Sequence, residues 1–167
     1  MIIRAERPAD AAAIREVNEA AFPTSAEADL VERIRASDGF VPDLSLVAEG
    51  PDGAVVGHLL LSYVSLAGSP VLALAPMAVL PEQQGKGVGS ALVVAALDAA
   101  EALEEPLVLV LGHPWFYPRF GFRPASRYGI LPPAPWPDAS FMAKPLTTYR
   151  GDLRGRVEYP PTFDSID

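Results

Sequence analysis

The stretch PEQQGKGVGSAL, residues 81–92, places three alternating glycines between an apolar run and a helix-like segment. Glycine tolerates backbone conformations that turn consecutive N–H groups toward one concave surface. The unpaired N–H groups at the start of the following helix add partial positive charge at the same place. The stretch therefore predicts a loop that holds the phosphate groups of a ligand.

The segments around this loop predict a crossover unit. Residues 71–79 are almost wholly apolar, as in a strand covered on both faces, and Pro76 within them predicts a bulge or a local loss of pairing. Apolar residues recur at helical spacing over 87–103, and 107–111 is a second apolar strand. Strand, loop, helix and strand in this order predict two parallel strands.

The rest of the chain predicts a mixed α/β architecture. Thr24 and Glu27 have the spacing of a capping box, and Pro51-Asp-Gly53 marks the turn of a hairpin. We expect one domain over 1–167, in which 124–167 hold a proline-rich loop, the last strand and a C-terminal tail. The other expected elements are a strand at 1–5, helices at 8–21 and 24–37, a hairpin of 44–49 with 54–66, and the last strand at 140–146.

Composition limits the classes of function. Half of the 167 residues are apolar, and a net charge of −8 argues against nucleic-acid binding, which depends on Lys and Arg. The chain has no cysteine and only two histidines, so we expect no disulfide, no thiolate nucleophile and no metal site. No apolar run is long enough to span a membrane, and we expect a cytoplasmic protein with no membrane partner.

Two common phosphate loops do not fit the glycine stretch. A Walker loop needs Ser or Thr directly after its Gly-Lys pair, whereas Lys86 here is followed by Gly87. A dinucleotide fingerprint needs the spacing G-x-G-x-x-G, and these glycines are spaced G-x-G-x-G. A tight strand-to-helix turn that binds no ligand is the remaining alternative.

Two motifs resemble one known family. The pattern Gln84-x-x-Gly87-x-Gly89 is similar to the acyl-CoA pyrophosphate loop of the GNAT acyltransferase superfamily. The second motif, Tyr117-x-x-x-Gly121-Phe122, follows the next apolar strand and is similar to the family segment in which a tyrosine faces the thioester sulfur. The resemblance continues from Glu27 to the tail at 155–163 and is closest to the YhbS-like branch.

The resemblance implies a fold and a set of binding residues. The fold is a single GNAT-like α/β domain, with a central mixed, largely antiparallel sheet that is splayed between two parallel strands and flanked by helices. Acetyl-CoA would be the cosubstrate, without a metal, and its pantetheine arm would contact Met77, Ala78 and Val79. The pyrophosphate would be held by Gln84, Gly85, Lys86, Gly87, Val88, Gly89 and Ser90.

The resemblance also implies catalytic roles, beside which simpler structural roles remain. Tyr117 would donate a proton to the leaving thiolate, or it is a core tyrosine in an aromatic cluster. Glu27 is a candidate general base, or the capping partner of Thr24. His113 ends the second strand at a position where the branch more often has an acidic residue, and is the other candidate base. We expect a structural role for His58.

The implied function is transfer of an acetyl group from acetyl-CoA to a primary amine on an unidentified small molecule or peptide. The alternatives are an acetyl-CoA-binding sensor without turnover and a purely structural domain. Arg119 and Arg123 either contact the nucleotide 3′-phosphate or lie in solvent. The proline-rich segment and the tail beyond Arg150 are expected to border the acceptor, and the protein is expected to be a monomer or a homodimer.

Overall fold

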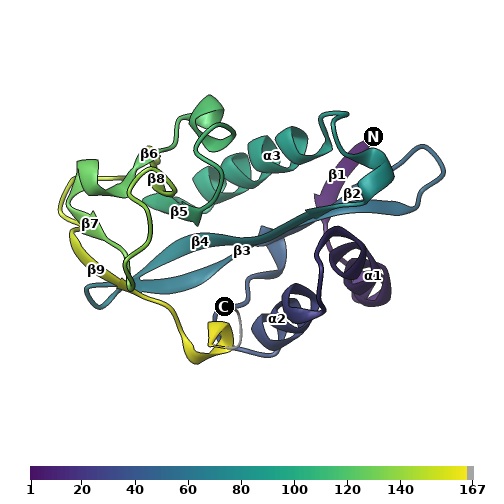
Figure 1. Cartoon of the computed structure of the whole chain (residues 1–167), viewed down its shortest axis with the longest axis horizontal. Helices are drawn as coiled ribbons and strands as arrows, with labels where there is room; N and C mark the ends of the chain where they lie inside the picture. Colours follow the sequence, from purple (N-terminus) through teal and green to yellow (C-terminus); the bar gives the residue numbers. More distant parts are fainter. Residues whose placement is uncertain (165–167) are drawn as a thin grey trace.

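The computed structural model describes residues 1–164, which form nine strands and three α-helices around one sheet (Figure 1). The helices are α1 (Ala11–Ala21), α2 (Ala26–Arg35) and α3 (Val88–Ala102). The strands are β1 (Ile2–Ala5), β2 (Ser45–Glu49), β3 (Val55–Leu66), β4 (Ser69–Val79), β5 (Leu107–Leu111), β6 (Arg123–Pro124), β7 (Ile130–Leu131), β8 (Phe141–Pro145) and β9 (Gly155–Glu158).

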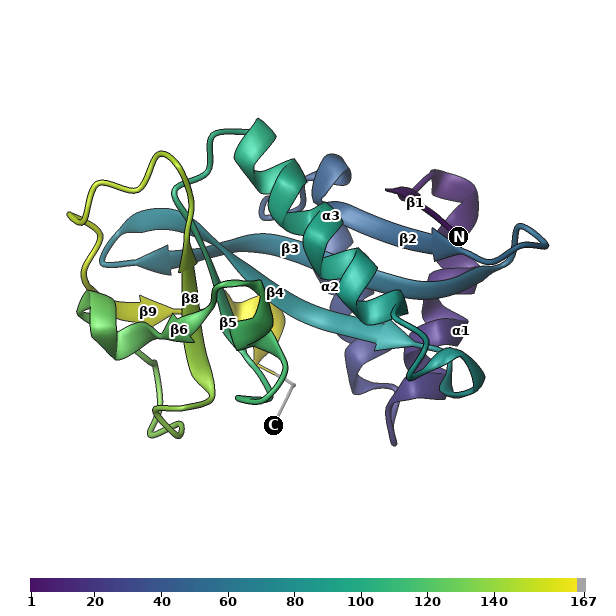
Figure 2. The same ribbon diagram turned by 90° about the horizontal axis from the view of Figure 1, so that it is seen from above.

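The sheet confirms the predicted topology. Its strand order is β1-β2-β3-β4-β5-β8-β6, and along this path only β4 and β5 are parallel (Figure 2). The predicted hairpin is β2 with β3, and the predicted crossover is β4, the glycine loop, α3 and β5. The two parallel strands therefore lie in the middle of an otherwise antiparallel sheet.

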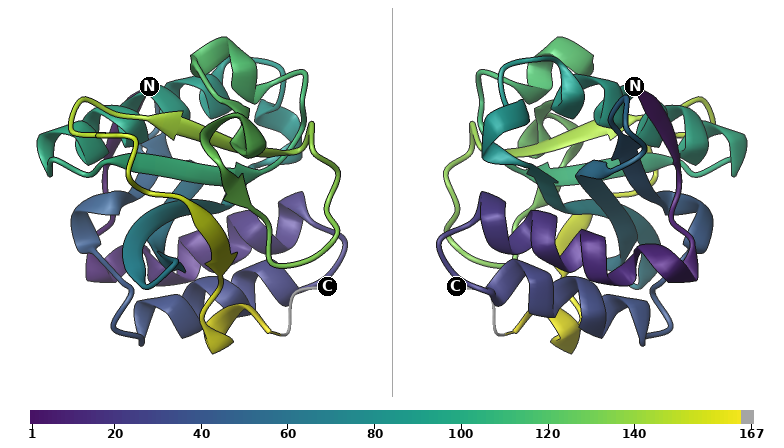
Figure 3. Two further views of the ribbon diagram at one scale, coloured as in Figure 1. Left: turned by 90° about the vertical axis from the view of Figure 1, so that its left-hand side faces the viewer. Right: turned by 90° about the vertical axis from the view of Figure 1, so that its right-hand side faces the viewer.

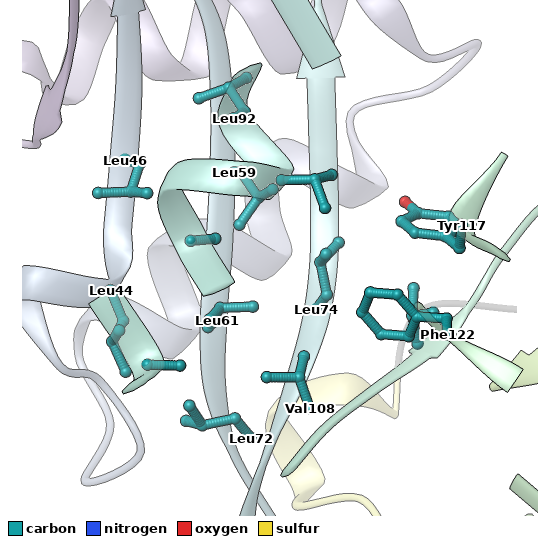
Figure 4. Close-up of a cluster of buried hydrophobic side chains, with 14 of the residues drawn as sticks. Leu44, Leu46, Leu59, Leu61, Leu72, Leu74, Leu92, Val108, Tyr117 and Phe122 are labelled. Atoms are coloured by element: carbon teal, nitrogen blue, oxygen red, sulfur yellow. The ribbon is translucent and has the colours of Figure 1, made fainter. Parts of the chain in front are cut away.

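The helices cover the two faces of the sheet. Figures 1 and 3 show α3 over one face and α1 with α2 over the other. Under α3, buried Leu61, Leu74 and Leu92 belong to one apolar cluster (Figure 4). Under α1 and α2, Ile14 and Leu60 belong to a second cluster. Burial of these faces is the main force that fixes the helices on the sheet.

Gly57 on β3 sets how closely α3 approaches the sheet. A Cβ atom on this glycine would lie 2.9 Å from Val88 Cγ1 and 3.1 Å from Leu92 Cδ1. Val88 is the first residue of α3, so the helix start rests directly on the backbone of β3. This contact fixes the position of the glycine loop relative to the sheet.

A strand forms where 140–146 predicted one, but it is not the last strand of the described chain. This segment is β8, but β9 follows it and pairs antiparallel with the end of β3, where Val157 faces Leu66. β9 also pairs in parallel with the short strand β7. With four and two residues, β9 and β7 are too short for a clear periodicity, and long-range pairing stabilises them.

Candidate active site

β4 and β5 pair over only three residues and then separate. The pairs run from Leu72 with Val108 to Leu74 with Val110. The register between β3 and β4 shifts at the cis peptide bond Ala75–Pro76, which confirms the bulge predicted there. Beyond Leu74, no strand of the described chain pairs with the β5-facing edge of β4. Its backbone groups are therefore free to bind an extended ligand.

The glycine loop lies at the end of this unpaired edge. Gly85 and Gly87 have φ angles of 77° and 86°, a conformation that favours glycine, and Gly87 directly precedes α3. No atom lies within 4 Å of the position that a Cβ would take on either glycine. The loop therefore leaves open space in front of the N–H groups that begin a helix of 15 residues.

The predicted binding residues take different places in this loop. Gln84 is tied to β4, because its Nε2 donates a hydrogen bond of 3.0 Å to the carbonyl of Val79. The side chain of Val88 is buried, so only its backbone can face a ligand, and Lys86 is exposed outside the cavity lining. The other predicted residues line the cavity: Met77, Ala78, Val79, Gln84, Gly85, Gly87, Gly89 and Ser90.

Tyr117 faces the gap from the β5 side. It begins the 3-10 helix η4 (Tyr117–Phe120), and its ring lies edge-on to Phe116 and Phe122 at centroid distances of 5.0 and 5.6 Å. Figure 4 shows its hydroxyl turned toward β4. The side chain lines the cavity but is only 6% exposed, and this burial raises its pKa to about 12. Tyr117 is therefore protonated at neutral pH and available as a donor.

Gly112 leaves the space that the Tyr117 ring occupies, a role that the sequence did not indicate. A Cβ on Gly112 would overlap the Tyr117 ring, whose Cδ2 would lie 2.8 Å away. Only a residue without a side chain allows the end of β5 to approach the ring so closely.

We expect Gly112→Ala to displace the Tyr117 ring and to lower kcat by about tenfold or more, because a small misplacement of a reacting group is costly. The affinity for acetyl-CoA should change little. The matched control is Gly39→Ala, since a Cβ at Gly39 meets its nearest atom at 3.5 Å, an ordinary contact. Unchanged kcat with a normally folded Gly112→Ala protein would contradict the positioning role.

Glu27 lies in the cavity lining and does not form the capping box. Thr24 Oγ1 accepts a hydrogen bond from the backbone N–H of Ala26 at 3.2 Å, and Ser25 is the residue that precedes α2. Glu27 Oε1 is buried and has no hydrogen-bond partner in the described chain. A buried carboxylate oxygen without a donor is unfavourable unless a ligand supplies one. The competing structural role for Glu27 is therefore wrong.

His113 also lines the cavity, at the end of β5. Its ring is stacked on the Trp115 indole, with centroids 4.9 Å apart and planes 15° apart. Its carbonyl accepts hydrogen bonds from the N–H groups of Phe116 and Tyr117, at 3.1 and 3.4 Å. The structure thus brings both candidate bases, together with Tyr117, to the same cavity.

His58 lies outside the cavity, as expected for a structural residue. It is completely buried, and its Nε2 donates to Ser45 Oγ at 3.0 Å while its Nδ1 accepts from Asn18 Nδ2 at 3.5 Å. Ser45 in turn donates to the Glu6 carboxylate. Burial, and secondarily the charge of Arg35, lower the pKa of His58 to about 3. His58 is therefore neutral in the folded protein.

Folding stability is expected to fall as the pH drops below 6.5, the ordinary pKa of histidine. The unfolded chain then binds a proton at His58 that the folded protein excludes until about pH 3, so the free energy of unfolding falls by about 1.4 kcal/mol per pH unit from this group. Urea unfolding of wild type and His58→Gln from neutral pH to about pH 5 measures the difference. If the free energy of unfolding changes with pH equally in the two proteins, His58 is not the group responsible.

The cavity has a volume of about 1210 Å³ and extends from the glycine loop through the gap to the opposite face of the sheet. At its far end it is lined by residues that the sequence did not indicate: Phe22, Leu30, Trp136, Tyr159, Phe163 and Asp164. Both the proline-rich segment and the C-terminal tail contribute to this wall. The sequence predicted these two segments to border the acceptor, without indicating the single residues. Short, irregular segments of this kind carry no periodic signal.

The two arginines near Tyr117 differ in their surroundings. Arg119 lines the cavity, and its guanidinium lies over the Phe116 ring at 4.6 Å from the centroid. Arg123 Nη1 donates to the carbonyls of Phe122 and Pro118, at 2.7 and 3.2 Å. Both guanidinium groups donate to backbone carbonyls, Arg119 through Nε to Phe116 at 3.3 Å, but only Arg119 also lines the cavity.

The part of the chain that the structure describes contains no candidate metal site and no candidate membrane-spanning helix. Within residues 1–164, no three His, Cys, Asp or Glu side chains are grouped so that they could hold a metal ion. None of the helices there combines the length and apolar character needed to cross a membrane.

Comparison with known proteins identifies relatives along almost the whole chain. A family model described as an acetyltransferase (GNAT) domain matches residues 42–124. YjhQ of Escherichia coli K12, named an uncharacterized N-acetyltransferase, is 40% identical over an alignment of 156 positions, which covers 89% of this chain and 86% of YjhQ. YhbS of the same strain, with the same description, is 34% identical over 167 residues, covering 98% and 99% of the two chains.

Two solved structures share the fold closely. The E. coli YhbS structure, a complex with CoA, has a TM-score of 0.92 and 30% identity, covering 99% of this chain and 93% of YhbS. A GNAT family acetyltransferase from Brucella melitensis, in complex with acetyl-CoA, has a TM-score of 0.81 and 33% identity, covering 98% and 97%. With similarity of this extent along nearly its whole length, the chain belongs to the GNAT acetyltransferase superfamily, in its YhbS-like branch, and is an N-acetyltransferase.

Proposed function

We propose that this chain transfers an acetyl group from acetyl-CoA to a primary amine, with Tyr117 as the general acid. The observation that carries the proposal is the single cavity that joins the glycine loop, the unpaired edge of β4 and the Tyr117 side chain. The relatives found as complexes with CoA and acetyl-CoA support the choice of cosubstrate.

The residues of the cavity fit an acyl-CoA molecule. Backbone N–H groups at Gly85, Gly87 and the start of α3 face open space and favour a pyrophosphate. Met77, Ala78 and Val79 offer backbone groups on the unpaired edge of β4 to an amide-containing arm. Bound acetyl-CoA supplies an activated acyl group with a thiolate leaving group.

The side chains of the cavity supply the proton transfers. A backbone N–H of β4 beyond Pro76 is available to stabilise negative charge on the thioester oxygen. Tyr117 donates to the departing sulfur, and although burial raises its pKa to about 12, the same environment raises the pKa of a thiol. Glu27, whose buried Oε1 lacks a donor, accepts a proton from the ammonium of the acceptor, which leaves a neutral amine to attack the thioester, with His113 as the second candidate base.

The proposal is tested by calorimetric titration with acetyl-CoA and by release of CoA over a panel of amines. The sequence contains no cysteine, so a thiol reagent reports free CoA without background from the protein. We expect saturable binding of acetyl-CoA and amine-dependent release of CoA. Binding without any turnover would favour the sensor alternative, and absence of binding would refute both.

A further inference from the structure

The end of the cavity opposite the glycine loop is an aromatic wall built from distant segments. Trp136 lies edge-on to Tyr159 at 5.6 Å and 72°, and Tyr159 lies edge-on to Phe163 at 5.0 Å and 78°. Phe22, at the end of α1, and Leu30 of α2 line the same cavity. Such a surface binds apolar groups and the faces of its rings attract cations.

The aromatic wall is fastened to the fold. Arg33 Nε on α2 donates a hydrogen bond of 3.0 Å to the carbonyl of Thr162, which lies between Tyr159 and Asp164. β9, directly before Tyr159, pairs with β3 and β7. Figure 3 shows the yellow 3-10 turn η6 (Pro161–Phe163) beside α2. The wall is therefore a fixed part of the cavity.

Negative charge prevails at this end of the cavity. Among the described lining residues, Glu27 and Asp164 are the carboxylates, and Arg119 is the single Lys or Arg. Arg119 belongs to the opposite end, because it lies over Phe116, whose Cζ is 3.8 Å from the Cβ position of Gly89 in the glycine loop. Glu27 is half-buried and its Oε1 is shielded from water, whereas Asp164 is exposed and its charge is weakened by water.

From this arrangement we propose that the acceptor is a small primary amine that carries an apolar, preferably aromatic, body and no carboxylate. The inference rests on the proposed function and names its substrate class. The ammonium lies near Glu27, and the body packs against Phe22, Trp136 and Phe163. A carboxylate on the acceptor would meet Glu27 and Asp164, while Arg33, the cation beside the wall, is bonded to the Thr162 carbonyl and does not line the cavity. A second ammonium in place of the apolar body would leave the apolar surface of the wall without a matching group.

Four acceptors separate these features: 2-phenylethylamine, phenylalanine, which adds a carboxylate, 1,4-diaminobutane, which replaces the ring by a second ammonium, and a tripeptide with a free N-terminus. We expect kcat/KM for 2-phenylethylamine to exceed that for phenylalanine by about 100-fold, because juxtaposed like charges cost several kcal/mol. It should exceed that for 1,4-diaminobutane and the peptide by about tenfold. Equal or higher values for any of the three would overturn the inference.

Variants of the wall test the same assignment. Phe163→Ala and Phe22→Ala should each raise KM for 2-phenylethylamine by about tenfold and leave acetyl-CoA affinity unchanged. Tyr149→Ala is the matched control, because Tyr149 packs against Tyr128 at 6.0 Å and is not a lining residue. Glu27→Gln should lower the preference for 2-phenylethylamine over phenylalanine by about tenfold. This ratio responds to the charge of Glu27, whereas a role as base alone would slow both substrates equally.

Calorimetry separates failure of this inference from failure of the proposed function. Titration of 2-phenylethylamine into the protein, with and without CoA, measures acceptor binding directly. If acetyl-CoA binds and 2-phenylethylamine neither binds nor reacts, the acceptor class is wrong and the acetyl-CoA assignment stands. If acetyl-CoA does not bind, the proposed function fails and the acceptor assignment with it, and the amine titration then reports only whether the aromatic wall binds 2-phenylethylamine.

Discussion

Replacement of Tyr117 by phenylalanine is expected to lower kcat for CoA release by about 100-fold or more, because it removes the proton donor to the leaving sulfur. The ring contacts with Phe116 and Phe122 do not involve the hydroxyl, so the fold and the affinity for acetyl-CoA should be retained. Steady-state kinetics with a saturating amine, together with calorimetry of acetyl-CoA binding, measures both quantities.

Tyr63→Phe is the matched control for this substitution. Tyr63 is also a partly buried phenol whose pKa is raised to about 12, by burial and by its hydrogen bond to Glu105, but it does not line the cavity. We expect wild-type kcat for this variant. If Tyr117→Phe keeps wild-type kcat as well, Tyr117 is a packing residue and the proton must reach the sulfur by another route.

Replacement of Gly87 by aspartate is expected to weaken acetyl-CoA binding by about 100-fold or more, because its carboxylate would enter the space proposed for the pyrophosphate. No atom lies within 4 Å of the Cβ position at Gly87, so the side chain fits without a clash. The left-handed backbone of Gly87 strains any other residue there, so the variant is expected to lose some stability as well. Calorimetric titration of the folded variant with acetyl-CoA measures the effect.

Gly68→Asp controls for backbone strain and for the added charge. Gly68 has a φ of 88°, close to the 86° of Gly87, and likewise has no atom within 4 Å of its Cβ position. It lies in the turn between β3 and β4, outside the cavity lining. We expect unchanged acetyl-CoA affinity for Gly68→Asp. An equal loss of acetyl-CoA affinity in both variants, or no loss in either, would refute the phosphate-binding role of the loop.

The cosubstrate half of the candidate site could be predicted from the sequence because it is local. The two glycines at 85 and 87 impose a backbone shape that few other residues adopt, and they stand between an apolar strand and a helix within one continuous stretch. Pro76 removes a backbone donor within a strand, and the bulge lies there. Crossover geometry then determines that β4 and β5 are parallel.

The acceptor half was decided by the tertiary structure. Phe22, Trp136 and Phe163 are far apart in the sequence and meet only because α1 and α2 cover one face of the sheet and β9 returns to β3. Likewise, the spacing of Thr24 and Glu27 fitted a capping box, yet the helix starts so that Glu27 turns into the cavity. Local spacing describes the neighbours of a residue along the chain, and these positions depend on neighbours brought together by packing.

The sequence by itself thus determined the mixed α/β class and the glycine loop, since backbone sterics and apolar periodicity act over a few residues. The tyrosine segment was indicated by its resemblance to the GNAT superfamily. Only the tertiary structure decided that Gly112 holds the Tyr117 ring, that Glu27 has a buried, unpaired oxygen, and that aromatic residues of the tail form the far wall. The physical reason is that close packing and burial depend on side chains from separate segments, which are defined only when the whole sheet is assembled.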